Sequence, residues 1–315
     1  MRVLFAGTPS VAADTLRGLL DDGRHEVIGV LTRPDAPKGR SGRPVPSPVA
    51  VLAHERGLTV YRPAKPGDAD FRAQLAALAP DVCVVVAYGG MIPSSMLDVP
   101  AFGWANVHYS LLPRWRGAAP VQHAILAGDE TTGVSVIRLV AALDAGPVLA
   151  QTPCPVGGRD SGELLDTLAG IGTATLLRCL DDLGTGVATP AEQSDDGMTL
   201  APKLTPEDAR IDWSRPADEV WRLVRACHPA PVAWTTLGGE RFRILGAQVA
   251  DVPGLRADVA GTPSLLPGAV WTTKRSVVVG CGQGALELTT VQPQGRRPMA
   301  AADWGRGLRA DVEFV

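Results

Sequence analysis

The 315-residue chain has few cysteines and no paired metal or redox motif. Its five cysteines are scattered without a C-x-x-C spacing: Cys83, Cys154, Cys179, Cys227 and Cys281. A dispersed, odd-numbered set is typical of reduced thiols in a cytosolic protein and argues against a disulfide framework. Four of the five histidines also lack metal-ligand spacing, so we expect no metal site: His25, His54, His123 and His228.

Long hydrophobic runs are absent as well. No stretch approaches the roughly 18 apolar residues that a membrane-spanning helix needs. The first ten residues, MRVLFAGTPS, lack the apolar core and cleavage signal of a secretory leader. We therefore expect a cytoplasmic protein without a membrane span, and nothing in the sequence demands more than a monomer.

Excess positive charge is also missing, because 30 Lys and Arg residues face 33 Asp and Glu residues, a net charge of -3. A general polyanion binder is usually basic, so any nucleic-acid contact must be local. One segment, residues 33 to 43, carries four cations against Asp35: Arg33, Lys38, Arg40 and Arg43. It is interpreted either as a mobile surface loop or as an arm for a phosphate backbone.

The glycines of a dinucleotide-binding fingerprint are missing too. A first apolar run ends at Gly7, where G-x-G-x-x-G would be needed, but Thr8, Pro9 and Ser10 follow. A plain turn into a helix, with proline in its first turn, explains the segment. We therefore expect no NAD cofactor.

The first half of the chain does contain alternating strand and helix patterns. Strands are predicted at residues 2–6, 26–31, 81–86, 104–107, 133–139 and 148–154, and helices at 11–20, 47–56, 71–78, 117–127 and 162–183. This rhythm predicts an α/β fold with a parallel sheet and right-handed crossovers. Ligands of such sheets bind beyond the carboxyl ends of the strands.

The composition changes after the last of these helices. Residues 187–206 are rich in Gly, Pro, Ser, Asp and Thr and predict a linker between domains 1–186 and 207–315. The second domain has one clear helix at 217–227 and short strands at 242–245, 268–271, 277–279 and 286–291, which suggest a small antiparallel barrel. Its tryptophans are expected to anchor the core, with contact between one or two of them and a nucleic-acid base as the alternative: Trp213, Trp221, Trp234, Trp271 and Trp304.

Two polar side chains stand where a predicted strand ends, in W-A-N-V-H-Y-S-L-L-P-R-W-R-G. Asn106 and His108 are two residues apart, so they share one face of the strand. An amide and an imidazole suit a reaction in which a carbonyl oxygen becomes negative while a proton moves. The alternative is a hydrogen-bonded pair that only holds the loop.

Asp144 is a candidate third member of this site. It lies among small residues before a predicted strand, and Gly146 allows its turn to approach closely. It is either an ordinary turn residue or a partner that orients His108 and favours the protonated imidazole.

These segments resemble the methionyl-tRNA formyltransferases over nearly the whole chain. The resemblance includes F-A-G-T-P at 5–9, P-S-P-V at 46–49, V-V-V-A-Y-G at 84–89, N-V-H-Y-S-L-L-P-R-W-R-G-A-A-P at 106–120, L-D-A-G-P-V-L at 143–149, A-R-I-D-W at 209–213 and V-Q-P-Q-G-R-R-P-M at 291–299. The central block is specific to folate-dependent formyl transfer, and the C-terminal blocks favour this member over its relatives.

The resemblance implies a Rossmann-type, mostly parallel sheet with helices on both faces, followed by an OB-like β-barrel that lies along tRNA. It implies formyl transfer from 10-formyltetrahydrofolate to the methionine α-amino group of initiator Met-tRNA, with Asn106, His108 and Asp144 as the catalytic residues. The folate would contact Tyr88, Gly89, Met91, Ser110, Leu111, Leu112 and Pro113. The basic segment, through Arg33, Lys38, Arg40 and Arg43, would grip the tRNA.

Some positions depart from the family pattern. Tyr109 replaces a small residue and is expected to narrow or cover the folate entrance. Gly90 and Met91 replace a usual Leu-Ile pair and are expected to loosen the pocket wall, and residues 140–142 are less polar than usual. Two other functions stay open: a formyltransferase acting on a nucleotide-linked amino sugar or other small amine, and a non-enzymatic RNA-binding protein.

Overall fold

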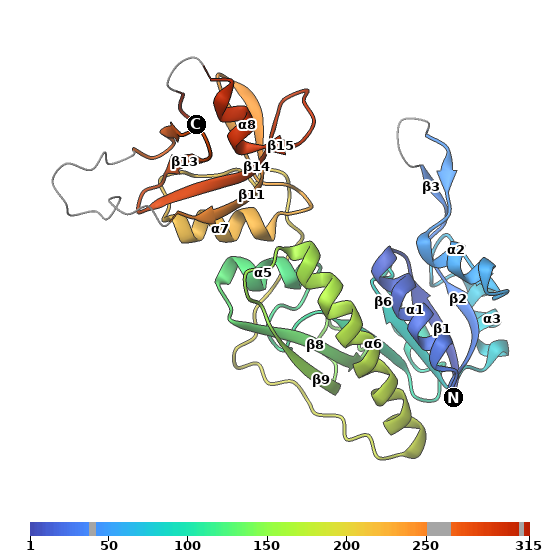
Figure 1. Ribbon diagram of the computed structural model, residues 1–315. Helices are drawn as coiled ribbons and strands as arrows, with labels where there is room; N and C mark the ends of the chain where they lie inside the picture. The colour runs from blue at the N-terminus through green and yellow to red at the C-terminus, as the bar shows by residue number, and fades with distance from the viewer. Residues whose placement is uncertain (38–41, 251–265, 309–311) are drawn as a thin grey trace. The chain divides into compact units, whose positions relative to one another are not determined.

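The computed structural model describes residues 1–37, 42–250, 266–308 and 312–315 (Figure 1). It divides into two compact units. The first consists of Met1–Pro120, Thr131–Pro155 and Leu165–Ala201, and the second of Val121–Glu130, Val156–Leu164 and Pro202–Val315.

The first unit is built on a seven-stranded sheet. Its strands are β1 (Arg2–Gly7), β2 (Glu26–Leu31), β5 (Val60–Tyr61), β6 (Val82–Val86), β7 (Trp104–His108), β8 (Thr131–Arg138) and β9 (Val148–Pro155), in the order β5-β2-β1-β6-β7-β8-β9. The first five strands in this order pair in parallel, whereas the pairs β7–β8 and β8–β9 are antiparallel. The short connection between β8 and β9 permits antiparallel pairing without a crossover helix. The predicted mostly parallel sheet is confirmed.

Helices cover both faces of this sheet: α1 (Ser10–Asp22), α2 (Pro48–Glu55), α3 (Ala69–Leu78), α4 (Ser94–Leu97) and most of α6 (Ser161–Thr185). On one face α1 contacts α6, where the Thr173 hydroxyl lies 3.3 Å from that of Thr15. On the other face Phe71, Leu75 and Met96 pack in one apolar cluster with Trp104 of β7. The side chains of β7 alternate between these two faces.

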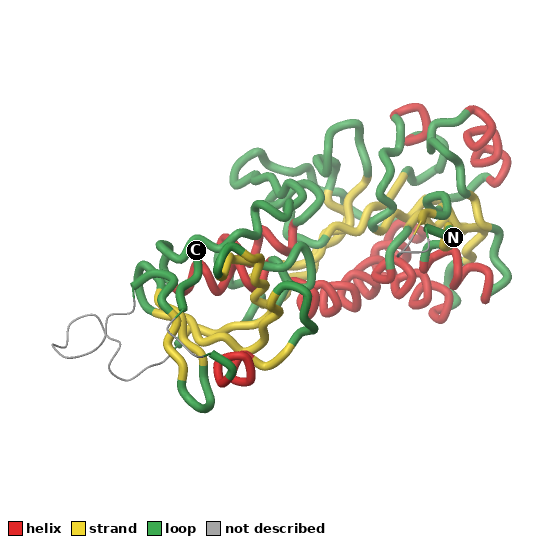
Figure 2. The backbone as a smooth tube through the Cα atoms, turned by 90° about the horizontal axis from the view of Figure 1, so that it is seen from above, coloured by secondary structure: helices red, strands yellow, loops and turns green. Residues whose placement is uncertain are grey.

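The second unit consists mostly of strands and loops (Figure 2). An antiparallel sheet joins β10 (Trp234–Leu237), β11 (Glu240–Val249), β14 (Ala285–Pro293), β13 (Val277–Gly280) and β12 (Val270–Thr272) in that order, and β15 (Met299–Ala300) pairs with β14. The helices α5 (Pro120–Ala127), α7 (Ala217–Ala226) and α8 (Ala301–Arg306) and the start of α6 also belong to this unit. This matches the predicted helix and the antiparallel pattern; β10, β15 and α8 were not predicted.

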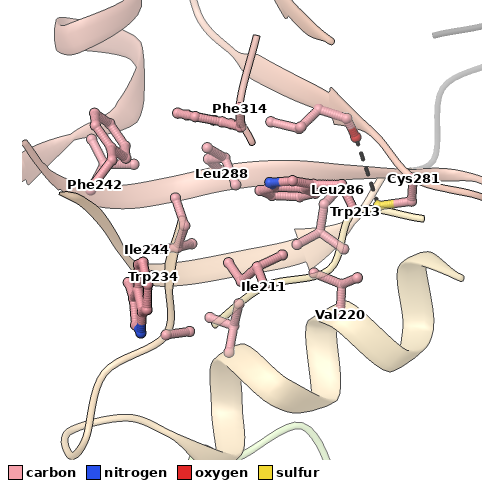
Figure 3. Packing of buried hydrophobic residues seen from close by; sticks show 14 of the residues in the cluster. Ile211, Trp213, Val220, Trp234, Phe242, Ile244, Cys281, Leu286, Leu288 and Phe314 are labelled. Atoms are coloured by element: carbon pink, nitrogen blue, oxygen red, sulfur yellow. Dashed lines mark hydrogen bonds between the residues drawn. The ribbon is translucent and has the colours of Figure 1, made fainter. Parts of the chain in front are cut away.

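An aromatic core holds the second unit together (Figure 3). Trp213 stacks on Phe314, with ring centroids 5.7 Å apart, and Phe314 also contacts Phe242. Trp213 and Trp234 are buried, as predicted for core anchors. The prediction is wrong for Trp271, which is 44% exposed. The three-residue strand β12 that carries it pairs with β13 on one side only in the described sheet, so less of its surface is covered.

Candidate active site

The carboxyl end of β7 carries the first two candidate residues. Asn106 and His108 lie on the same face as Trp104, and His108 pairs across the sheet with Ser135 of β8. His108 is only 5% exposed, whereas Asn106 is half-buried. The Asn106 amide forms no hydrogen bond to the described part of the chain, so its donors are available to a ligand.

The third candidate, Asp144, lies beside His108. The imidazole Nδ1 is 3.7 Å from Oδ2 of Asp144, an ion-pair distance that is too long for a hydrogen bond. The other ring nitrogen, Nε2, lies 2.8 Å from the carbonyl oxygen of Trp115. A carbonyl only accepts, so Nε2 carries a proton and donates. In the neutral ring the Nδ1 lone pair therefore faces Asp144.

Burial decides the charge of this imidazole. Removal from water lowers the pKa of His108 below its usual value; the Asp144 carboxylate and the hydrogen bond to Trp115 raise it, but less strongly. Asp144 is expected from the sequence to favour the protonated ring, and its carboxylate does raise the pKa of His108. Desolvation of the buried ring outweighs the attraction of the carboxylate, so the ring is neutral near pH 7.

The Asp144 turn is held in a conformation that few residues adopt. Asp144 has φ 45°, in the left-handed region, and its Oδ2 accepts a hydrogen bond from the backbone N–H of Gly117 at 2.9 Å. A Cβ atom at Gly146 would lie 1.8 Å from the carbonyl oxygen of Arg138. Gly146 therefore permits the close approach that the sequence predicts for this turn.

The side chains of Gln193 and Arg116, neither of which was a candidate from the sequence, support the turn. Gln193 donates from Nε2 to the carbonyl oxygens of Asp144 (2.7 Å) and Gly146 (2.8 Å), and its Oε1 accepts from Arg116 at 3.0 and 2.8 Å. Gln193 lies in the segment predicted as a linker, where one polar residue among many gives no sequence signal.

The segment Ser110–Pro113, interpreted as a folate-binding turn, is held mainly through its own backbone. The carbonyl of Ser110 accepts from the hydroxyl of Ser135 at 2.6 Å, and the N–H of Leu112 donates to the same hydroxyl at 3.1 Å. Gln151 donates to the carbonyl of Leu112 at 2.9 Å. These contacts leave few backbone groups of the turn for a ligand.

Ser135 and Gln151 were also missed from the sequence. They are opposite one another in β8 and β9, and Ser135 is opposite His108, so the three form a row across the sheet. Ser135 is fully buried, and it stands within the otherwise apolar stretch G-V-S-V-I. A buried hydroxyl in such a stretch is the signal that could have identified it, because buried polar groups need partners.

The other predicted folate wall, residues 84–92, has a buried part and an exposed part. The Tyr88 side chain lies in the apolar core at 1% exposure, and its carbonyl accepts from the Thr8 hydroxyl at 2.7 Å. Met91 is 85% exposed, and Gly89 has φ 79°. A Cβ atom at Gly90 would lie 2.8 Å from the Tyr88 ring and 3.3 Å from Arg33. The replacement by Gly90 was expected to loosen the pocket wall, but the side chains of Tyr88 and Arg33 fill the space beside it.

Tyr109 is expected from the sequence at the folate entrance, but its side chain lies in the core, on the face of the sheet opposite His108. It follows His108 and projects to the opposite face, where a Cβ atom at Gly172 of α6 would lie 3.5 Å from its ring. Tyr109 is 7% exposed, and burial raises its pKa to about 12. The ring is a core residue beneath α6.

The basic segment divides into a base and a tip. Arg33, at the base, is half-buried beside Tyr88 and Gly90. A short hairpin, β3 (Ala36–Pro37) paired with β4 (Pro44–Val45), carries the tip, and Arg43 is exposed next to β4. Lys38 and Arg40 lie outside the described residues.

The described residues also bear on the expected thiols, metal ligands and membrane span. All five cysteines are free and buried. Across the described ranges, no three His, Cys, Asp or Glu side chains are grouped to hold a metal ion. Among the helices of the described chain, none has the length and apolar character to cross a membrane.

Comparison with known proteins assigns the chain to a family. A formyl transferase family model matches residues 1–180, and a model of the formyl transferase C-terminal domain matches residues 203–309. The methionyl-tRNA formyltransferases of Streptomyces avermitilis and Streptomyces coelicolor are each 51% identical over 310 residues, covering 98% of this chain and 97% of theirs.

A solved structure shares the fold. A variant of HypX from Aquifex aeolicus superposes with a TM-score of 0.67 at 20% identity, covering 99% of this chain and 49% of that one. At this identity the likeness concerns the fold alone, whereas the relatives at 51% identity match end to end. The chain therefore belongs to the methionyl-tRNA formyltransferase family.

Proposed function

We propose that this chain transfers a formyl group from 10-formyltetrahydrofolate to the methionine α-amino group of initiator Met-tRNA, and that Asn106, His108 and Asp144 carry out the transfer. The observation that carries the assignment is the pairing of His108 Nδ1 with Asp144 Oδ2 at 3.7 Å. These residues are 36 positions apart in the chain. Asn106, on the same face of β7, keeps its amide unpaired among the described residues.

Asn106 is suited to bind the formyl oxygen. The folate co-substrate supplies an activated formyl carbon, whose oxygen gains negative charge as the amine adds. An amide N–H already fixed near that oxygen stabilises the charge without reorganising, and such a donor typically contributes about 10²–10³-fold in rate.

His108 and Asp144 are suited to take up the amine proton. The neutral ring has its Nε2 proton bound to Trp115, so Nδ1 is the free acceptor. A proton at Nδ1 creates an imidazolium beside the Asp144 carboxylate, and their attraction then favours the charged ring. As the tetrahedral adduct collapses, the bond between the formyl carbon and the folate nitrogen breaks, and the imidazolium returns this proton to the leaving nitrogen. The Gly117 N–H keeps that carboxylate in place.

The Ser110–Pro113 turn and the 84–92 segment flank this site in sequence and are proposed to hold the folate. Ser135 and Gln151 fix the turn, so a flat ligand would meet a preformed surface. The set of groups fits the formyl donor: an open amide, a neutral imidazole and a carboxylate suit acyl transfer.

The tRNA is proposed to contact the tip of the basic segment through Lys38, Arg40 and Arg43, with Arg33 closer to the folate wall. We further propose that residues 1–186 form the catalytic domain and residues 207–315 the tRNA-binding domain, with a connection at 187–206. A cytoplasmic location follows from a role in translation initiation. A monomer is sufficient, because one chain supplies all the proposed catalytic groups.

The amino-sugar alternative and the non-enzymatic alternative are less favoured. Curated relatives that match the chain over 98% of its length carry the tRNA enzyme's name. A purely RNA-binding protein would leave the His108–Asp144 pair without a role.

Incubation with 10-formyltetrahydrofolate and methionyl initiator tRNA, followed by analysis of the released aminoacyl end, tests the function directly. A parallel reaction with a nucleotide-linked amino sugar separates the two enzyme activities. His108→Ala is expected to lose roughly 10²–10⁴-fold in turnover while its circular dichroism is unchanged. Unchanged turnover in that variant would remove the catalytic assignment.

A further inference from the structure

We propose that Gln193 is a positioning residue for the reaction: it holds the Asp144 carboxylate opposite His108. The inference rests on the proposed role of Asp144. Gln193 is half-buried and comes from a polar segment that composition alone predicts to be a linker.

The Gln193 amide uses its full hydrogen-bonding capacity. Both N–H groups of Nε2 are donated, one to the carbonyl of Asp144 and one to the carbonyl of Gly146. Both lone pairs of Oε1 are used as well, because Nε and an Nη atom of Arg116 donate to it. An amide can make no more bonds than these four, so its position is determined by its neighbours.

These four bonds connect the two segments that build the site. Asp144 and Gly146 belong to the turn that presents the carboxylate. Arg116 lies between Trp115, whose carbonyl binds His108, and Gly117, whose N–H binds Asp144. Gln193 therefore ties together the partners on both sides of the His108–Asp144 pair.

The Asp144 turn needs such a support. Its backbone is in the left-handed region at φ 45°, which an aspartate adopts only at some cost. Residues 141–143 just before it are exposed, so little packing restrains the entry to the turn. Fixing the carbonyls on both sides of Ala145 sets the orientation of the peptide planes and, through them, the direction of the carboxylate.

The segment that carries Gln193 is itself anchored on both sides. Before it, Ala191 exchanges two backbone hydrogen bonds with Val148 at 2.7 and 2.9 Å. After it, the Thr199 carbonyl accepts from Arg116 N–H, and Ala201 exchanges bonds with Arg116 and Ala119. We call residues 191–201 the strap. The strap lies against the turn as a fixed element, which makes its glutamine able to position a side chain precisely enough for catalysis.

Side-chain chemistry distinguishes Gln193 from other residues at this site. Glutamate would keep the acceptor for Arg116 but has no N–H to donate to Asp144 and Gly146. Methionine would keep the length and lose all four bonds. Gln193→Glu therefore replaces the link to the turn with a carboxylate that repels both carbonyl oxygens, and it retains an acceptor for Arg116.

The experiment compares Gln193→Glu, Gln193→Met and Asp144→Asn in formyl transfer to methionyl initiator tRNA. We expect both Gln193 variants to lose about 10- to 100-fold in kcat/KM, mainly in kcat, because a displaced catalytic group costs this much. We also expect the pKa of His108, followed by NMR of the imidazole, to fall in Gln193→Met, because the carboxylate that raises it moves away. In Gln193→Glu the added negative charge acts in the opposite direction on this pKa. Glu192→Ala is the matched control, since this neighbouring side chain is exposed, and it should behave as wild type.

A double-mutant cycle separates positioning from general stability. If Gln193 acts through Asp144, adding Gln193→Glu to Asp144→Asn causes little further loss in kcat/KM. Full additivity, wild-type kcat/KM in Gln193→Glu, or wild-type kcat/KM and His108 pKa in Gln193→Met would overturn the positioning role. Wild-type activity in Asp144→Asn would instead overturn the proposed catalytic site, so the two failures are distinguishable.

Discussion

Nδ1 of His108 lies 3.7 Å from Oδ2 of Asp144, while the other nitrogen of the imidazole, Nε2, donates to the carbonyl of Trp115 at 2.8 Å. The ring is thus held in one tautomer by a backbone group and not by the carboxylate. Asp144 is anchored separately, through Gly117. This arrangement leaves Nδ1 free to accept a proton beside a negative charge, which is the state a general base needs.

The first prediction concerns pH. Because burial lowers the pKa of His108 below 6.5, the neutral ring predominates at pH 7, and kcat/KM should fall on acidification with an apparent pKa below 6.5. In Asp144→Asn this acid limb should move to lower pH, since the attraction that raises the pKa is gone. A rate profile that instead declines as pH rises through 6.5 would mean that the protonated ring is the active form.

The same pKa shift affects folding. The unfolded chain binds a proton at His108 more readily than the folded chain does. The contribution of the neutral ring to the free energy of unfolding is therefore present above pH 6.5 and is lost as pH falls. Urea unfolding between pH 5 and 7 should show a shallower pH dependence in His108→Gln than in wild type. His25, whose pKa is also lowered by burial, contributes in the same direction and is unchanged in both proteins.

The second prediction concerns Asn106. Replacing it with alanine removes the open amide and should reduce kcat about 10²–10³-fold, because the donor acts on charge that develops during the reaction. Folate affinity, measured by fluorescence titration, should change little. A loss confined to folate binding, with kcat retained, would assign Asn106 to substrate binding.

The third prediction concerns the basic segment. Arg43 is exposed beside β4, so Arg43→Ala should weaken use of tRNA and spare folate binding. If the guanidinium contacts a phosphate, the slope of log affinity against log salt should become smaller by roughly 0.7–0.9. Arg72→Ala, an exposed arginine on α3, is the control. Equal weakening in both variants would point to net charge and not to a local contact.

The fourth prediction concerns Tyr109, whose side chain lies in the core beneath α6, on the face of the sheet opposite His108. Tyr109→Ala should lower the free energy of unfolding in urea by about 3–5 kcal/mol, the usual cost of removing a buried aromatic ring. The KM for the folate should stay near the wild-type value. Tyr109→Phe keeps the ring and should differ by less than about 1.5 kcal/mol. A lower folate KM in the alanine variant would restore the entrance role.

Much of the fold was readable from periodicity. The near-continuous apolar run D-V-C-V-V-V predicts a strand covered on both faces, and β6 is such a strand. The i, i+2 spacing of Asn106 and His108 predicts a shared face, because side chains alternate along a strand. The same alternation would have placed Tyr109 on the opposite face, had it been applied one residue further.

The contacts of the strap and of Ser135 and Gln151 could not be predicted from periodicity. Their partners, Asp144 and Leu112, are between 23 and 49 positions distant in the chain. Local pattern carries no information about which polar residues meet after such a separation, and residues 187–206 have the composition of a linker whether or not they are bound. The contact between Gly90 and Arg33 could not be predicted for the same reason, since the two residues lie in different loops.

By itself, then, the sequence determined the class of sheet, the strand that ends in Asn106 and His108, and the family motifs, since these depend on spacing within single elements. Only the tertiary structure decided the charge of His108, the anchoring of Asp144 and the position of Gln193. Each of these depends on how strongly water is excluded and which distant groups come within hydrogen-bonding distance, and both are properties of the folded chain.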